Sequence, residues 1–130
     1  SIQVIPEDHA YEKWANFPTS RARLFELIHE TRTPGVIFLS GDRHIAEISR
    51  YDEAEGYPLY EVTSSGLTHT WDEAQDEYNR HRIGNLLVAL NFGMIDFNWS
   101  EDPVTLDLQV RDREGELRLE QTLGLSDLDY

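Results

Sequence analysis

The alternation of apolar and polar residues along the chain predicts one helix near the N-terminus. From Thr19 onwards the apolar residues recur at the spacing of a helix, so that one side of the segment is apolar. Its apolar residues are Leu24, Phe25, Leu27 and Ile28. Thr19 or Ser20 is suited to cap the first turn, and the segment TRTPG cannot continue the helix because of its proline and glycine.

Other apolar segments predict strands. The expected strands are residues 1–5, 36–40, 45–49, 59–65, 85–90, 94–99, 104–112 and 116–123. The run VIFLS at 36–40 is continuously apolar up to its last residue, which is typical of a strand covered on both faces. In 104–112 the apolar residues alternate with polar ones, which predicts one buried face and one solvent face. Residues 6–18 and 68–82 have neither period and are expected to be loops.

The order of these elements predicts the fold class. Strand, helix, strand at the beginning is the order of a βαβ unit, so we expect a largely parallel sheet there. The C-terminal half consists of strands only, and REG at 113–115 joins the last two as a hairpin. A chain of 130 residues is long enough for one hydrophobic core. We therefore expect an α/β fold with mixed α+β sheets, forming a single domain or part of one over 1–130.

The charge and composition of the chain limit the classes of partner and of site that we expect. Acidic residues number 25 against 11 basic ones, for a formal net charge of −14. We therefore expect no nucleic acid and no anionic membrane surface as partner, and cations fit better. The absence of cysteine excludes disulfides, zinc–thiolate sites and thiol nucleophiles. No apolar run approaches the roughly 20 residues that span a bilayer. The residues themselves leave the compartment open.

The first candidate site is SGDRH, directly after the run at 36–40. Gly41 permits a sharp turn, and if the backbone then stays extended, Asp42 and His44 face one crevice beyond the carboxyl end of the strand, where open α/β sheets bind ligands. Carboxylate and imidazole together suit a transition metal, and they also suit a general base oriented by an acid. The alternative is structural: Asp42 caps a turn and His44 is a half-buried, hydrogen-bonded histidine.

The second candidate is TSSGLTHTW, where another expected strand ends in small and hydroxyl residues. Backbone N–H groups of such a turn can bind an anion, and Ser64, Ser65 and Thr68 can add hydroxyl donors, with His69 and Trp71 close behind in the sequence. The alternative is a plain Ser-Gly turn. Two strand ends of this kind in one chain favour a shared crevice.

These segments give the chain a resemblance to a known family. SIQV, KWANFPTSRARLFELI, GVIFLSGDRHIAE and VTSSGLTH occur in this order and cover nearly the whole chain. In these segments the sequence resembles the C-terminal part of the PhoD-like alkaline phosphatases, a branch of the calcineurin-like metallophosphoesterases. The resemblance implies the C-terminal half of an αββα sandwich and the hydrolysis of phosphate mono- or diesters.

The resemblance also implies roles for single residues. Members of the family carry two divalent or trivalent metal ions, with Fe, Zn, Mn and Ca as the candidates, which bind the phosphate oxygens and activate a water. His44 looks like a metal ligand. Asp42 stands where many relatives have another histidine, so it is a ligand, an orienter of an imidazole or a turn former. Ser65, Gly66 and His69 look like the substrate-binding rim. Many relatives are exported, so the resemblance implies a periplasmic or secreted location.

The chain differs from the family chiefly in the metal-binding motifs that it lacks. The family's earlier metal-binding motifs are of the D-x-H, G-D-x-x-D and G-N-H-[DE] kinds. No D-x-H precedes SGDRH, the other two do not occur in the chain, and its one Gly-Asp pair is Gly41-Asp42. We therefore expect the 130-residue chain to be inactive by itself and to work with a missing N-terminal half of the same protein. The alternative is a non-catalytic α/β binding or interaction module derived from that fold.

Overall fold

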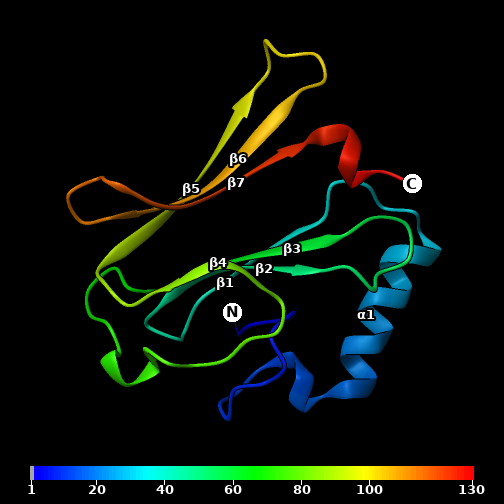
Figure 1. The fold of residues 1–130 in the computed structure, drawn as a ribbon. Coiled ribbons are helices and arrows are strands. Elements are labelled where there is room, and N and C mark those ends of the chain that lie inside the picture. The colour runs from blue at the N-terminus through cyan, green and yellow to red at the C-terminus, as the bar shows by residue number, and fades with distance from the viewer. Residues whose placement is uncertain (1) are drawn as a thin grey trace.

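The computed structural model describes residues 2–130, and this part of the chain forms a mixed α+β fold of two sheets and one α-helix (Figure 1). The helix and strands are α1 (Pro18–Glu30), β1 (Ile37–Ser40), β2 (Ala46–Tyr51), β3 (Leu59–Ser64), β4 (Arg82–Leu87), β5 (Asn91–Asn98), β6 (Thr105–Asp112) and β7 (Leu117–Gly124). Short 3-10 helices are η1 (Trp14–Asn16), η2 (Asp72–Ala74) and η3 (Leu125–Leu128). The broad α+β class expected from the sequence is confirmed.

The first sheet has the strand order β1-β3-β2-β4, and the second has the order β5-β6-β7. Only β1 and β3 pair in parallel among the described strands; β2 is antiparallel to both of its neighbours, and the second sheet is antiparallel. The expected βαβ unit with a largely parallel sheet is therefore wrong. Its first strand is missing: residues 2–5 form no strand, and Ser1 lies outside the described residues.

The two sheets pack face to face and enclose the core (Figure 1). The apolar face of the first sheet contributes Ala46, Ile48 and Val62, all at most 4% exposed. From the second sheet come the alternating residues of β6, Leu106, Leu108 and Val110, again nearly fully buried. The alternation seen in the sequence of 104–112 thus gives the buried face of β6, as expected.

The helix and the first strand are less buried than expected. Phe25 and Ile28 of α1 pack against the core, but Leu27 is 46% exposed, because it lies off the line that faces the sheet. VIFLS forms β1 at the edge of its sheet rather than a strand covered on both faces, and Leu39 is 66% exposed. Within residues 2–130, none of the helices has the length and apolar character needed to cross a membrane.

Candidate functional site

The two candidate segments of the sequence lie at the same end of the first sheet. Strands β1 and β3 are parallel neighbours, with Ser40 opposite Thr63. The carboxyl ends of both strands therefore lie at the same end of the sheet. The segments are joined by backbone hydrogen bonds, from Ser65 N to Ile45 O at 3.1 Å and from Trp71 N to His44 O at 3.1 Å. The turn after β1 and the loop after β3 thus form one continuous surface.

Two imidazoles meet on this surface. The ring centroids of His44 and His69 are 3.9 Å apart, with the ring planes inclined by 69°. His44 is half-buried, whereas His69 is exposed and its Nδ1 lies 3.0 Å from the hydroxyl of Thr68. Asp42, two residues before His44, is exposed. Two imidazoles in contact can share a proton or bind the same transition metal ion. A single imidazole is less suited to either function.

The backbone of the turn is left-handed rather than extended. Asp42 has φ = 68° and His44 has φ = 54°, so the expectation of an extended backbone is wrong. The chain has to reverse from β1 into β2 within a few residues, and left-handed residues achieve this. Such conformations cost roughly 1–2 kcal/mol per non-glycine residue and persist where the surroundings enforce them, a condition that is common at functional sites.

Arg43, between the two left-handed residues, fastens the turn to the interior. Its side chain is 4% exposed and donates from Nη1 to Gln3 Oε1 at 3.0 Å. Its Nη2 donates to both carboxylate oxygens of Glu77, at 2.9 and 2.7 Å. The guanidinium also lies 4.9 Å from the centre of the Tyr11 ring. Because Arg43 points inwards, the residues on either side of it are held at the surface.

A buried polar network, which we call the Glu47 network, extends from Arg43 beneath the site. Gln3 Nε2 donates to Glu47 Oε1 at 2.7 Å and to Thr63 Oγ1 at 2.8 Å, and Arg82 Nε donates to Glu47 Oε2 at 2.6 Å. Sequence reasoning missed this network. The available signal was a glutamate at the centre of each of two expected strands, Glu47 and Glu61, flanked by apolar residues on both sides.

Glu61 explains why residues 2–5 form no strand. It is fully buried, and its carboxylate accepts hydrogen bonds from Val4 N at 3.0 Å and Ile5 N at 2.6 Å. A side-chain acceptor thus replaces the neighbouring strand of a sheet. Burial raises the pKa of the Glu61 carboxyl, although these hydrogen bonds act in the opposite direction.

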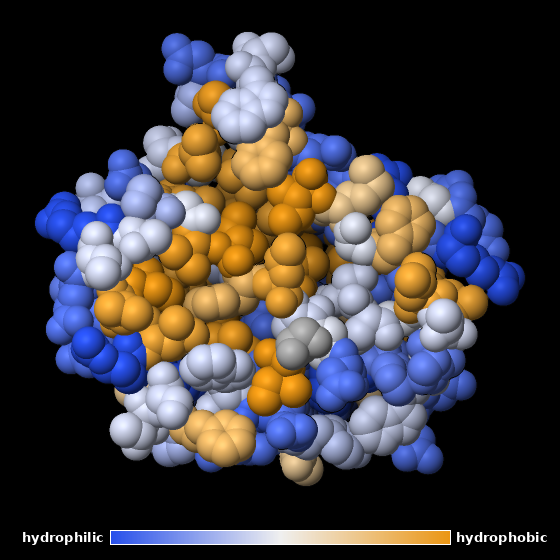
Figure 2. Space-filling view, turned by 180° about the vertical axis from the view of Figure 1, so that it is seen from behind, coloured by the Kyte–Doolittle hydropathy of each residue, from blue (hydrophilic) through white to orange (hydrophobic). Residues whose placement is uncertain are grey.

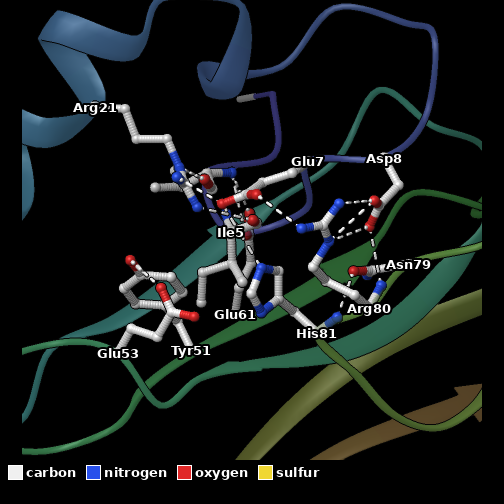
Figure 3. Close-up of polar contacts among 11 residues, drawn as sticks. Ile5, Glu7, Asp8, Arg21, Tyr51, Glu53, Glu61, Asn79, Arg80 and His81 are labelled. Carbon is white, nitrogen blue, oxygen red and sulfur yellow. Dashed lines mark hydrogen bonds and ion pairs between the residues drawn. The ribbon is translucent and has the colours of Figure 1, made fainter.

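The segment after Ile5 is held by arginines (Figure 3). Arg21 of α1 donates from Nη2 to Ile5 O at 3.0 Å, and its Nη1 pairs with Glu7 Oε1 at 2.8 Å. Arg80 donates from Nη2 to Asp8 Oδ1 at 2.6 Å, and this partner lowers the pKa of the Asp8 carboxyl. The segment 2–17 therefore covers the polar face of the first sheet and connects to the loop after β3.

His9 in this segment is neutral near pH 7. It is 6% exposed, and burial, together with the charges of Arg43 and Lys13, lowers its pKa to about 4. Its Nδ1 accepts a hydrogen bond from Tyr11 N at 3.2 Å, while its buried Nε2 has no partner within residues 2–130. The ring of Tyr11 meets that of Trp71 edge-on, with the ring centroids 4.6 Å apart, so this segment contacts the loop after β3.

Ser65 and Gly66 brace the turn. The hydroxyl of Ser65 donates to Ile45 O at 3.1 Å and accepts from Arg43 N at 3.2 Å. Gly66 is buried, and a Cβ atom there would collide with the side chain of Asn91. The expected contact of these residues with a substrate stays a prediction, but their bonds within the protein already connect the two candidate segments.

The donors of the site do not complete a metal centre by themselves. Within residues 2–130 there is no group of three or more histidine, aspartate and glutamate side chains placed to hold a metal ion. His44 and His69 supply at most a pair of ligands, and a transition metal in a protein usually takes at least three from the chain. No protein-family model, curated protein or solved structure matches the chain, so the chemistry of the site follows from its own residues.

Proposed function

We propose that this chain forms the C-terminal part of a metal-dependent phosphoric ester hydrolase, a PhoD-like phosphatase or phosphodiesterase built as a metallophosphoesterase-type αββα sandwich. The observation that carries the proposal is the meeting of His44 and His69, 3.9 Å apart, beyond the carboxyl ends of the parallel pair β1 and β3. Each histidine comes from one of the segments on which the resemblance rests. Ligands of open α/β sheets bind at such ends.

The proposed roles follow from exposure and contacts. His44 and His69 offer imidazole nitrogens to a metal or to the oxygens of a phosphate ester, and Asp42 adds a carboxylate at the same surface. A bound pair of metal ions would supply charge stabilisation of the phosphate and an activated water. Because this chain does not complete the ligand set, the remaining ligands come from the missing N-terminal half in this proposal.

The rigidity of the turn supports a site rather than a plain loop. The left-handed Asp42 and His44 are held by a buried ion pair between Arg43 and Glu77 and by the hydroxyl of Ser65. A binding site works best when supporting bonds fix its side chains before the ligand arrives. A loop that merely joins two strands needs no such support, and a glycine at either left-handed position would serve it better.

The test uses the full-length gene product that contains this chain. We expect His44→Ala and His69→Ala to lower its content of Fe, Zn, Mn and Ca, and to abolish hydrolysis of p-nitrophenyl phosphate and bis(p-nitrophenyl) phosphate. His29→Ala is the matched control, because His29 is exposed on α1 and pairs with Glu55. Unchanged metal content in His44→Ala contradicts the proposal. A gene product with neither metal nor hydrolysis favours the non-catalytic module.

A further inference from the structure

A pocket of about 490 Å³ opens between α1 and the loop that joins β2 to β3 (Figure 1). Its volume lies within the range of roughly 300–1,000 Å³ that is typical of small-molecule sites. Tyr51 and Leu59, which line the pocket, pair with each other at one end of β2 and β3. The candidate site lies at the other end, where Ala46 pairs with Ser64. The pocket and the histidine pair are therefore at opposite ends of the first sheet.

The walls of this pocket are aromatic, and we call it the aromatic pocket. Four rings line it, those of Phe25, Tyr51, Tyr57 and Tyr130. The ring centroids of Phe25 and Tyr51 are 5.0 Å apart, and those of Tyr57 and Tyr130 are 5.4 Å apart. The hydroxyls of Tyr57 and Tyr130 donate to backbone carbonyl oxygens at 2.6 and 3.0 Å. Both tyrosine rings are thus held in place by the protein itself.

The lining of the aromatic pocket has an excess of negative charge. Four glutamates line it, two from α1 and two from the loop after β2: Glu26, Glu30, Glu53 and Glu55. Arg23 pairs with both glutamates of α1, at 2.8 and 3.0 Å. Within residues 2–130, Glu53 and Glu55 have no arginine or lysine partner, and Glu55 lies 2.9 Å from Nε2 of His29. Even with a protonated His29, the four carboxylates outnumber the two cations.

The chain already places cations against three of the four rings. The guanidinium carbon of Arg21 lies 4.8 Å from the centre of the Phe25 ring and 5.4 Å from that of Tyr51. That of Arg32 lies 5.2 Å from the centre of the Tyr130 ring. The face of an aromatic ring attracts cations, most strongly where both are shielded from water. Neither arginine is among the described residues that line the pocket, so neither neutralises its carboxylates from within.

Charge distinguishes the aromatic pocket from the other apolar surfaces. Figure 2 shows a broad apolar face of the molecule, seen from behind. The groove between β1 and β5, which Leu39 and Met94 line, has no charged residue among the described residues of its lining. Such a surface does not indicate the chemistry of a ligand. Aromatic rings beside carboxylates, in contrast, favour an organic cation over a neutral or anionic molecule.

We propose that the aromatic pocket binds a small organic ammonium ion that carries an aromatic or alkyl group. The carboxylates of Glu53 and Glu55 attract the ammonium group, and the rings pack against the attached apolar group. A volume of about 490 Å³ is many times the roughly 30 Å³ of a water molecule, so the pocket has room for more than an ammonium group. The proposal is independent of the proposed function, because the pocket shares no residue with the histidine site.

Three ligands with the same benzyl group and different charges test the proposal: benzyltrimethylammonium, benzyl alcohol and phenylmethanesulfonate. Their dissociation constants are measured by isothermal titration calorimetry on the full-length gene product that contains this chain. We expect benzyltrimethylammonium to bind at least about tenfold more tightly than benzyl alcohol, and phenylmethanesulfonate not to bind. Equal affinity for the cation and the alcohol overturns the proposal, as does the absence of binding by the cation.

Single substitutions test whether the cation binds in the aromatic pocket. We expect Glu53→Gln and Glu55→Gln each to raise the dissociation constant of benzyltrimethylammonium by about threefold, because each removes one attracting charge. Asp52→Asn is the matched control: Asp52 is adjacent to Glu53 but pairs with Arg50 and does not line the aromatic pocket. All three side chains are exposed, so the substitutions leave the core intact.

The outcomes separate the aromatic pocket from other modes of binding. Unchanged affinity in both glutamine variants overturns the proposal. An equal loss in Asp52→Asn shows a general attraction to the net charge of the chain and overturns it as well. Loss of binding in His44→Ala places the cation at the histidine site and likewise overturns the proposal, whereas loss of metal alone in that variant tests only the proposed function.

Discussion

Asp42 and His44 hold left-handed backbone conformations on the two sides of a buried arginine. At φ = 68° the backbone of Asp42 favours glycine over any residue with a Cβ atom. We expect Asp42→Gly to have a higher free energy of unfolding than Asp42→Ala, by about 1 kcal/mol, in urea titrations.

The same pair of substitutions at Asp76 is the control. Asp76 is exposed in the loop after β3 and is not among the residues with positive φ. There alanine should be the more stable variant, because glycine costs roughly 0.5–1 kcal/mol of unfolded-state entropy. The same order of stability at both positions would contradict a strained turn.

His9 makes stability depend on pH. Its pKa is about 4 in the folded protein against an ordinary 6.5, because the ring is buried near Arg43 and Lys13. Between these values the unfolded chain binds more protons than the folded one, so stability decreases as the pH falls through this window. We expect His9→Gln to reduce the loss of unfolding free energy between pH 7 and pH 4.5, roughly the limits of this window. His29 is exposed on α1, and we expect His29→Gln to lose as much unfolding free energy over this pH range as the unsubstituted protein.

At the scale of the elements, the sequence predicts those whose pattern arises locally. The helical spacing at Leu24 and Ile28 and the alternation in β6 depend on one buried face each, and both elements form as expected. Residues 2–5 have the composition of a strand, but their amide partner is the carboxylate of Glu61, 56 residues or more along the chain. A local sequence pattern carries no information about a contact between residues so far apart in the chain. The prediction of a largely parallel sheet is wrong for this reason.

In the candidate site, too, local patterns predict single residues but not the contacts between distant segments. Gly41, Asp42 and His44 were identified because they follow an apolar run, and His69 because it follows another. That His44 and His69 would meet depends on the parallel pairing of β1 and β3, which neither segment reveals alone. The inward side chain of Arg43 was missed for the same reason: its partners, Gln3 and Glu77, lie far away in the sequence.

The Arg43–Glu77 ion pair joins two elements, the turn after β1 and the loop after β3. The side chains are 4% and 13% exposed, so removal of one partner leaves a buried charge without compensation. We expect Glu77→Ala to lower the free energy of unfolding by about 3 kcal/mol, measured by urea titration. Asp76→Ala, one residue earlier and exposed, should change it by less than about 0.5 kcal/mol. Similar values for the two variants would show that the pair does not fasten the turn.

At the scale of the whole molecule, the acidic charge opposes folding. The 25 acidic and 11 basic residues leave a formal net charge of −14 on a chain of 130 residues, and these charges repel one another more strongly in the compact state than in the unfolded chain. Salt screens the repulsion, since the Debye length falls from about 30 Å at 0.01 M to about 3 Å at 1 M. Salt also weakens exposed ion pairs such as Arg23–Glu26, but each of these contributes little stabilising free energy to begin with.

We therefore expect the urea midpoint of the isolated chain to rise when NaCl is raised from about 0.01 M to about 0.5 M, over which the screening length falls severalfold. The buried Arg43–Glu77 pair is shielded from salt and contributes equally at both concentrations, so the change reports the surface charge. Replacing NaCl by KCl should give the same rise, because screening depends on ionic strength and not on the identity of the cation. A midpoint that falls with salt would mean that the surface ion pairs, and not the excess of carboxylates, dominate the electrostatics of this protein.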